Sequence, residues 1–171
     1  MSECEMVVRQ RTADKASPTV DASSFIETDR TSPIYRDRMT QVHRTLDPDG
    51  VPAAVGGYSH AAVVPPGTEL LFVAGQVPED LDGSVPDGFA DQARVAWRNV
   101  ERCLAAAGFT LDHLVKVSMY IRDRNYRVAN REVRHEVLGD RRPALTVLVT
   151  DHWDERWLIE IEAIAARPVT G

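Results

Sequence analysis

The chain has 171 residues and a formal net charge of −6 at neutral pH, from 26 acidic and 20 basic residues. This acidic balance argues against a nucleic-acid-binding surface, which is normally basic. No apolar run is long enough to span a membrane, and the N-terminus carries acids where a signal peptide carries bases. Two cysteines provide neither a disulfide framework nor a metal-binding pattern, so a cytoplasmic setting is expected.

Residues 1–38 are rich in Ser, Thr, Asp and Arg and show no sustained hydrophobic period. This composition predicts a flexible extension, or an arm that packs on a neighbouring molecule. Residues 39–168 contain the periodic segments, and we expect them to form a single domain.

Glycines occur at two notable places in the first part of this domain, near the end of a predicted strand and just before Tyr58. Residues 41–45 alternate weakly and predict an edge strand, and residues 69–76 predict a mostly buried strand that ends near Gly75. A glycine at such a point often allows a ligand or another chain to approach the backbone closely. Two further glycines precede Tyr58 and permit a backbone path that aims its ring across a crevice.

Apolar residues spaced by three and four predict helices over residues 88–107 and 125–138. Asp87 is expected to cap the start of the first helix, and Gly108 and Gly139 are expected to end the two helices.

Residues 114–121 alternate as a strand, and Asp112 is expected to cap a half-turn just before it. Residues 142–166 predict a final hairpin of two strands joined by a polar loop over residues 151–156. Its second strand places Glu160 and Glu162 side by side on one face. These carboxylates must face water, a partner subunit or a ligand, and strand geometry alone favours water.

The predicted order is β-β-α-β-α-β-β, which indicates a two-layer α+β domain with both helices on one face of a mixed sheet. The opposite face is too apolar on balance for open solvent, so oligomerisation is expected to cover it. The residues predicted for that face are Ser118, Tyr120, Thr146, Leu148 and Leu158.

The sequence contains no phosphate-binding glycine loop, dinucleotide fingerprint, HExxH helix or nucleophile elbow. Its five histidines are scattered and are expected in loops or on the surface. His60 is kept as a candidate binding residue because it lies two positions after Tyr58. Cys103 falls on a helix face among apolar residues and is expected to be a packed thiol.

Several motifs, in order, resemble those of the RidA (YjgF-type) family of reactive-intermediate and imine deaminases. They are Gly57-Tyr-Ser-His-Ala61, Phe72-Val-Ala-Gly-Gln-Val-Pro78, Leu114-Val-Lys-Val-Ser-Met-Tyr-Ile121, Asn130, Arg142-Pro-Ala144 and Ile159-Glu-Ile-Glu-Ala-Ile-Ala165. The resemblance extends from Met39 to Pro168. It implies a chorismate-mutase-like fold, a homotrimer with three small-molecule clefts at subunit interfaces, and no metal or organic cofactor.

The resemblance also implies roles for individual residues. Tyr58 corresponds to the family's cleft tyrosine, Gly75 to the glycine whose backbone faces the ligand, and Asn130 to the asparagine near the cleft. Glu160 corresponds to the glutamate credited with holding a water for attack on the imine carbon. A carboxylate in such a cleft is suited to passing protons.

Three positions depart from the family pattern. Leu145 replaces the arginine that grips the substrate carboxylate, Ala74 stands where many members have a serine, and Val147 stands where some have a reactive cysteine. Arg142 is an odd number of residues away from Leu145, so on a regular strand it cannot substitute for that arginine. Loss of one bidentate anchor is expected to weaken binding of a carboxylate ligand by about 2–4 kcal/mol. Activity on 2-aminoacrylate is therefore in question.

Three hypotheses follow. The leading one is a divergent RidA-like trimer that hydrolyses an imine, an enamine or a related small neutral or aromatic molecule, with Glu160 handling the proton and Tyr58 orienting the ligand. The second is a non-catalytic trimer that binds a metabolite or regulates a partner. The third, the endoribonuclease activity described in the family, fits the acidic charge poorly.

Overall fold

A computed structural model describes residues 42–169 of the chain, and the predicted extension over residues 1–38 lies outside this range. Six strands and two α-helices follow one another along the described residues. They are β1 (Arg44–Leu46), β2 (Ala61–Val63), β3 (Thr68–Gln76), α1 (Phe89–Ala106), β4 (Leu114–Ile121), α2 (Arg127–Leu138), β5 (Ala144–Val149) and β6 (Ile159–Pro168).

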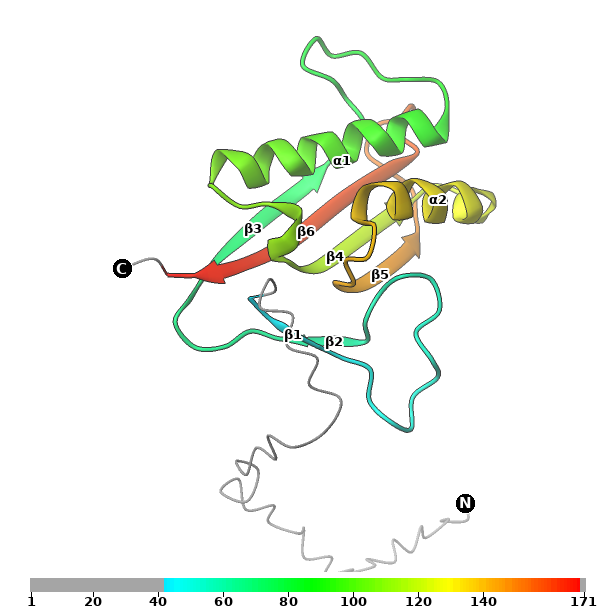
Figure 1. Ribbon diagram of the computed structural model, residues 1–171. Helices are drawn as coiled ribbons and strands as arrows, with labels where there is room; N and C mark the ends of the chain where they lie inside the picture. Colours follow the sequence, from blue (N-terminus) through cyan, green and yellow to red (C-terminus); the bar gives the residue numbers. More distant parts are fainter. Residues whose placement is uncertain (1–41, 170–171) are drawn as a thin grey trace, which may run out of the picture. The chain divides into compact units, whose positions relative to one another are not determined.

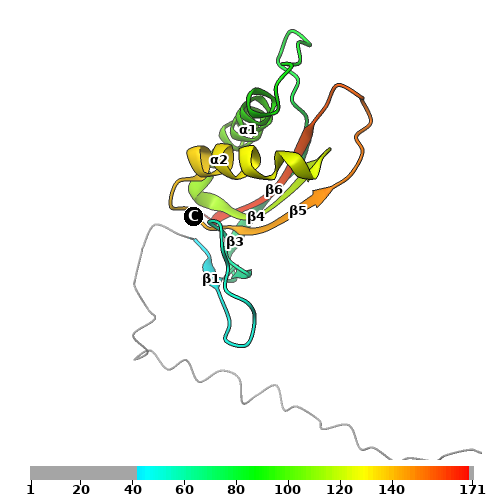
Figure 2. The same ribbon diagram turned by 90° about the vertical axis from the view of Figure 1, so that its right-hand side faces the viewer.

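Four strands form one mixed sheet in the order β3-β6-β4-β5, in which only β4 and β5 run parallel. Both helices cover the same face of this sheet (Figures 1 and 2). The predicted two-layer α+β architecture is therefore confirmed. The apolar stripe of α1 and the inward residues of β4 and β6 make the core between the two layers.

The predicted final hairpin is wrong. β5 and β6 follow one another in the chain, but β4 lies between them and pairs with both. β5 is reached from β4 through α2, which makes the parallel crossover that two parallel strands require. β6 then takes a central position, where its inward residues Ile159, Ile161 and Ala163 are all buried.

Three strands rather than two precede the first helix. β1 and β2 pair with each other as a separate antiparallel sheet and do not extend the edge of the main one. The predicted edge strand over residues 41–45 thus overlaps β1, which lies in this separate sheet and not at the edge of the main one.

The ends of the helices differ from the prediction in detail. Gly88, not Asp87, is the N-cap residue of α1, and no side chain caps this end. Thr110 and His113, not Asp112, form the capping box of the short turn before β4. α2 begins later than predicted, because residues 124–126 form a separate 3₁₀ turn. Gly108 and Gly139 end the helices as expected, each with a positive φ.

The face of the sheet away from the helices carries large exposed apolar side chains. Phe72 on β3 is 70 % exposed, and Leu148 on β5 is 52 % exposed. Lys116 donates to Thr146, and Tyr120 donates to Glu162, on the same face. The face therefore mixes polar pairs with apolar surface. Leu158 was predicted for this face but packs against the core, because it precedes β6 and lies outside the strand whose alternation was extended to it.

Candidate functional site

Glu160 lies on β6 beside a point where the pairing of β3 and β6 is irregular, between Val73 and Gln76. A Cβ atom added to Gly75 would overlap the Glu160 Oε1 atom and would lie 2.7 Å from its Cδ atom. The absence of a side chain at Gly75 thus makes room for the carboxylate. Ala74 is exposed at the same place, and the Glu160 side chain keeps 33 % of its surface exposed, so a ligand can reach it.

His152 is the residue at this site that the sequence prediction missed. Its side chain is only 1 % exposed, and its Nδ1 atom lies 3.8 Å from Glu160 Oε2. Burial lowers the pKa of His152 below the usual histidine value, although the Glu160 carboxylate acts in the opposite direction. His152 lies in a loop, one of the two positions expected for the histidines, but its burial was not predicted, because a loop residue has no periodicity from which burial can be inferred.

Two loops flank Glu160, and the amide of Gln92 joins them. Its Nε2 atom donates to the carbonyls of Pro86 (2.7 Å) and Arg156 (2.9 Å), and its Oε1 atom accepts from the backbone N–H of Leu158 (2.8 Å). Gln92 is buried on α1. The loop before α1 and the loop before β6 are therefore held together by one side chain.

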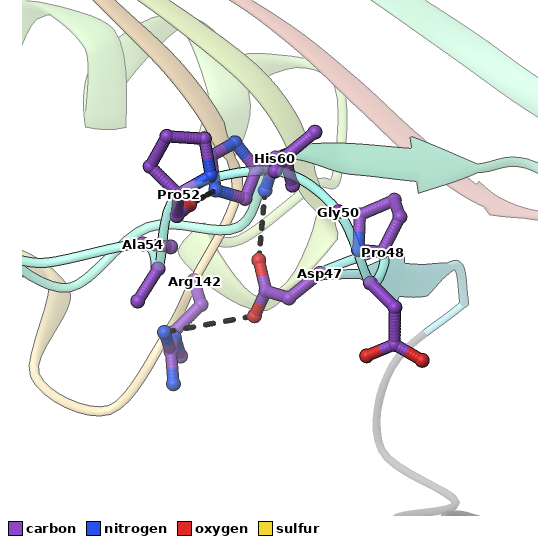
Figure 3. A pocket seen from close by; sticks show the side chains of 10 residues that line it. Asp47, Pro48, Gly50, Pro52, Ala54, His60 and Arg142 are labelled. Atoms are coloured by element: carbon purple, nitrogen blue, oxygen red, sulfur yellow. Dashed lines mark hydrogen bonds and ion pairs between the residues drawn. The ribbon is translucent and has the colours of Figure 1, made fainter.

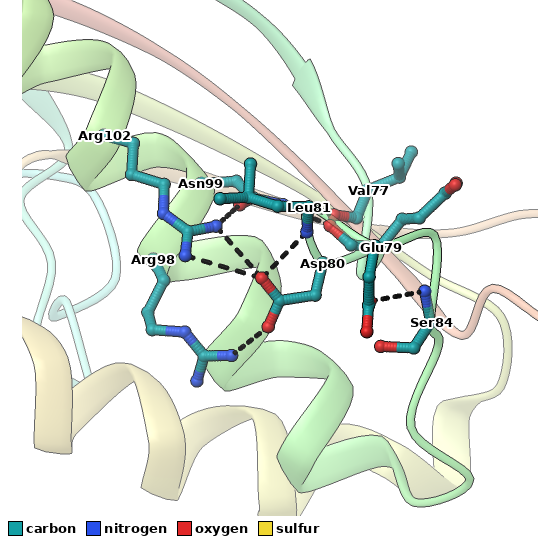
Figure 4. Close-up of polar contacts among 9 residues, drawn as sticks. Val77, Glu79, Asp80, Leu81, Ser84, Arg98, Asn99 and Arg102 are labelled. Atoms are coloured by element: carbon teal, nitrogen blue, oxygen red, sulfur yellow. Dashed lines mark hydrogen bonds and ion pairs between the residues drawn. The ribbon is translucent and has the colours of Figure 1, made fainter.

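The loop between β3 and α1, which Gln92 contacts at Pro86, is also fastened to α1 nearer to the end of β3 (Figure 4). Asp80 forms ion pairs with Arg98 (3.1 Å) and Arg102 (3.3 Å). The Asn99 amide donates to the carbonyls of Val77 and Glu79. These contacts fix the chain that leaves Gly75.

Tyr58 and His60 lie next to the edge of β5, away from Glu160. Their rings meet edge to face, with centroids 5.6 Å apart. The backbone N–H of Ser59 donates to the carbonyl of Pro143 (3.2 Å), and Arg142 donates to the carbonyl of Tyr58 (3.0 Å). Arg142 thus holds the backbone of Tyr58, which agrees with the expectation that it does not replace the family arginine.

α2 contributes two buried polar residues near this second group. Asn130 is 3 % exposed, and its Oδ1 atom has no hydrogen-bond partner within residues 42–169. Arg134 is 7 % exposed and donates to the carbonyl of Gly56 at 2.6 Å. Burial lowers the pKa of Arg134, the neighbouring Arg131 adds to this effect, and Tyr58 opposes it.

Leu145 and Glu160 lie on opposite faces of the sheet. Leu145 pairs with Val117 on the helix-covered face and packs against the core, whereas Glu160 pairs with Tyr120 on the open face. The predicted site residues therefore divide into two groups within one chain. The first comprises Glu160, Gly75 and Ala74. The second comprises Tyr58 and His60 at the edge of β5, the strand that carries Leu145. Asn130 lies on α2, as does Arg134, which donates to the carbonyl of Gly56.

His60 also borders a cavity of about 410 Å³ that is lined by residues 47–54 and Arg142 (Figure 3). Its Nε2 atom lies 2.7 Å from the carbonyl of Pro52, and its backbone N–H donates to Asp47 at 3.0 Å. Glu160 does not line this cavity. The contacts of His60 thus serve the loop that surrounds the cavity.

Neither a metal cluster nor a membrane helix is found in the described part of the chain. Residues 42–169 hold no group of three or more His, Cys, Asp or Glu side chains placed to share a metal ion. In the same range, neither α1 nor α2 combines the length and apolar character needed to cross a bilayer.

Comparison with known proteins gives consistent matches. The family model described as endoribonuclease L-PSP matches residues 49–167. A RutC family protein of Pyrococcus horikoshii is 36 % identical over 119 residues, which cover 68 % of this chain and 92 % of the relative. The 2-iminobutanoate/2-iminopropanoate deaminase of Rattus norvegicus is 29 % identical, covering 74 % of this chain and 91 % of the relative.

Solved structures agree with these matches. RidA from an Antarctic Psychrobacter superposes with a TM-score of 0.54 at 29 % identity, covering 71 % of this chain and 98 % of the other. A Rid family protein of Yersinia pestis superposes with a TM-score of 0.66, covering 74 % of this chain and 100 % of the other. The latter is 24 % identical and supports the fold alone.

Proposed function

Because this chain belongs to the RidA (YjgF-type) family, we propose that it hydrolyses the C=N bond of a small imine or enamine, with Glu160 handling the proton. The observation that carries the proposal is the placement of the Glu160 carboxylate over Gly75, partly exposed and beside the buried ring of His152. A carboxylate held in this way can accept a proton from an attacking water.

The reaction needs one water and releases ammonia. The oxygen of water attacks the carbon of the protonated imine while Glu160 takes one of the water protons, which gives a neutral carbinolamine. Glu160 then returns this proton to the nitrogen. The C–N bond breaks with release of ammonia, the hydroxyl proton passes to solvent, and the hydroxyl oxygen becomes the carbonyl of the product. One carboxylate can perform both transfers because the proton that it accepts is the proton that it returns.

We propose that the working cleft lies between two subunits of a homotrimer. Two observations support this assembly. The open face of the sheet exposes Leu70, Phe72 and Leu148, which is more apolar surface than a monomer usually leaves uncovered. In addition, Glu160 and Leu145 face opposite sides of the sheet within one chain, and a neighbouring copy that contributes the second group would complete a cleft around Glu160.

The proposed substrate lacks a carboxylate beside its imine. Leu145 offers no hydrogen-bond donor. Arg142 donates to the carbonyl of Tyr58 and pairs with Asp47 beside the cavity that His60 borders, which Glu160 does not line. Loss of about 2–4 kcal/mol from a missing charged anchor corresponds to roughly a hundredfold weaker binding of a carboxylated imine. A neutral or aromatic substituent would pack on Leu145 instead.

The test measures ammonia release by the purified full-length chain. One substrate is 2-iminopropionate, produced during the assay by an amino-acid oxidase, and the others are uncharged imines produced from amines by an amine oxidase. We expect faster turnover of an uncharged imine and its loss in Glu160→Gln. Fast turnover of 2-iminopropionate that Glu160→Gln leaves unchanged would overturn the proposal. Thermal stabilisation by these compounds without turnover would support a binding protein instead.

A further inference from the structure

We propose that His152 is a positioning residue for Glu160, holding the carboxylate through an N–H on its Nδ1 atom. This inference deepens the proposed function and rests on it for the catalytic role of Glu160. The geometry on which it depends is the 3.8 Å approach of His152 Nδ1 to Glu160 Oε2 from a ring that is almost completely buried.

The ring of His152 has one nitrogen directed at an acceptor and one without a partner. Nδ1 faces the carboxylate, whereas Nε2 is buried and has no hydrogen-bond partner among residues 42–169. A neutral imidazole carries a single N–H, and the proton is most stable on the nitrogen that faces an acceptor. The structure therefore assigns the Nδ1–H tautomer to His152.

Two charged groups act on the ring. Burial lowers the pKa of His152, the Glu160 carboxylate on β6 raises it, and the guanidinium of Arg122, just after β4, lowers it. The backbone of Leu158 also raises this pKa by hydrogen bonding to the ring. The balance favours the neutral ring, because its pKa lies below the ordinary histidine value. A neutral N–H donor can fix the orientation of a carboxylate without neutralising its charge.

The loop that carries His152 is fixed by hydrogen bonds to its second half, residues 154–156. Arg122 donates to the carbonyls of Glu155 (2.6 Å) and Asp154 (3.3 Å), and Gln92 donates to the carbonyl of Arg156. The neighbouring Trp153 is 96 % exposed, so burial is confined to the histidine at this point of the loop. A ring fixed in this way has little freedom to move, and such rigidity is required of a residue that positions another.

The separation of 3.8 Å is longer than a hydrogen bond. Catalytic hydrogen bonds are often long without substrate and shorten when the substrate is bound. Glu160 is the partner able to move, because its side chain is partly exposed and its carboxylate lies over a glycine. We expect the Nδ1 to Oε2 distance to shorten when a ligand presses on the carboxylate.

The first experiment needs no catalytic activity. The ring nitrogens of His152 are followed by nitrogen-15 NMR as the pH is varied, in the full chain and in Glu160→Gln. The expected signature is the Nδ1–H tautomer in the wild type and a lower pKa for His152 in Glu160→Gln, because the carboxylate that raises this pKa is gone. Glu162→Gln, on the same face of β6, is the control and should leave the titration of His152 unchanged.

The second experiment measures turnover of the best uncharged imine. His152→Phe keeps a planar ring but has no donor, and its kcat should fall roughly tenfold or more with little change in KM. His152→Asn keeps an N–H donor close to the Nδ1 position and should recover part of kcat. Circular dichroism and thermal melting show whether each variant is folded.

Three results would overturn the inference. They are an Nε2–H tautomer in the wild type, a titration of His152 that Glu160→Gln leaves unchanged, and a wild-type kcat in His152→Phe when Glu160→Gln is inactive. If Glu160→Gln retains full turnover, but the wild type shows the Nδ1–H tautomer and the pKa of His152 is lower in Glu160→Gln, the proposed function fails and the pairing of the two side chains stands.

Discussion

Replacing Gly75 with alanine tests whether the space above this glycine exists for the Glu160 carboxylate. The three atoms nearest to an added Cβ all belong to Glu160. The φ angle of Gly75 is not positive, so alanine brings no backbone strain of that kind. The new methyl group must therefore be accommodated by movement of a single, partly exposed side chain.

The expected change in the free energy of unfolding depends on whether Glu160 is present. Moving Glu160 out of its preferred rotamer costs about 0.5–1.5 kcal/mol. The Gly→Ala change itself stabilises by about 0.4–1 kcal/mol, because it restricts the unfolded chain. Gly75→Ala should thus be close to neutral in the wild type, and should stabilise the chain in Glu160→Ala, where the clash is absent.

The assay is a double-mutant cycle of urea unfolding at one fixed protomer concentration, since an oligomer's stability depends on concentration. The expected coupling free energy is about 0.5–1.5 kcal/mol. Gly88→Ala is the control, because its Cβ would meet nothing closer than Asp91 at 4.0 Å and its effect should be the same in both backgrounds.

Catalysis should respond more strongly than stability. A displacement of the carboxylate by about 1 Å is expected to lower kcat/KM on the order of a hundredfold. Equal effects of Gly75→Ala on stability with and without Glu160 would refute the expected clash between the new methyl group and the carboxylate. A folded Gly75→Ala variant with wild-type kcat/KM would refute the idea that catalysis requires the carboxylate in its present position.

Three further predictions concern the loops and the open face. Gln92→Leu removes three buried hydrogen bonds and should lower the free energy of unfolding by about 2–4 kcal/mol in urea titrations, and an unchanged midpoint would contradict the fastening role given to this amide. The pKa of Asp80 is lowered by the backbone N–H of Leu81 and by the two arginine partners of Asp80. The stabilisation from the Asp80 carboxylate is therefore complete above the ordinary aspartate pKa and is lost as the pH falls through the lower pKa of the folded state. The stability of Asp80→Asn, measured by unfolding at several pH values, should lack this pH-dependent loss. Phe72→Glu places a charge on the exposed apolar face and should yield folded monomers in analytical ultracentrifugation, whereas an unchanged trimer would show that this face is not the subunit contact.

The sequence by itself determined the secondary structure elements and the face on which Glu160 lies. The alternation along β6 and β4 and the helical stripe of α1 depend only on local spacing, and the structure buries the predicted residues in each case. The close approach at Gly75 was also predictable, because a glycine in a strand indicates that something lies where its side chain would be.

Strand pairing was decided by the tertiary structure. Every strand offers the same backbone donors and acceptors, so local sequence does not state which neighbour it takes. β6 lies between β3 and β4 because a strand with an apolar inward face and a mixed outward face is best covered at the centre of the sheet. The hairpin predicted from its position next to β5 in the chain was wrong for this reason.

Which residues come together at the site could likewise not be predicted from local sequence. The loop that carries His152 is held by Arg122 and Gln92, which come from distant parts of the chain. Leu145 and Glu160 face opposite sides of the sheet because they pair with Val117 and Tyr120 of β4, which are an odd number of residues apart. The hydrophobic periodicity of a segment depends only on the residues of that segment. The contacts that a side chain makes depend on long-range packing, which brings together residues far apart in the chain.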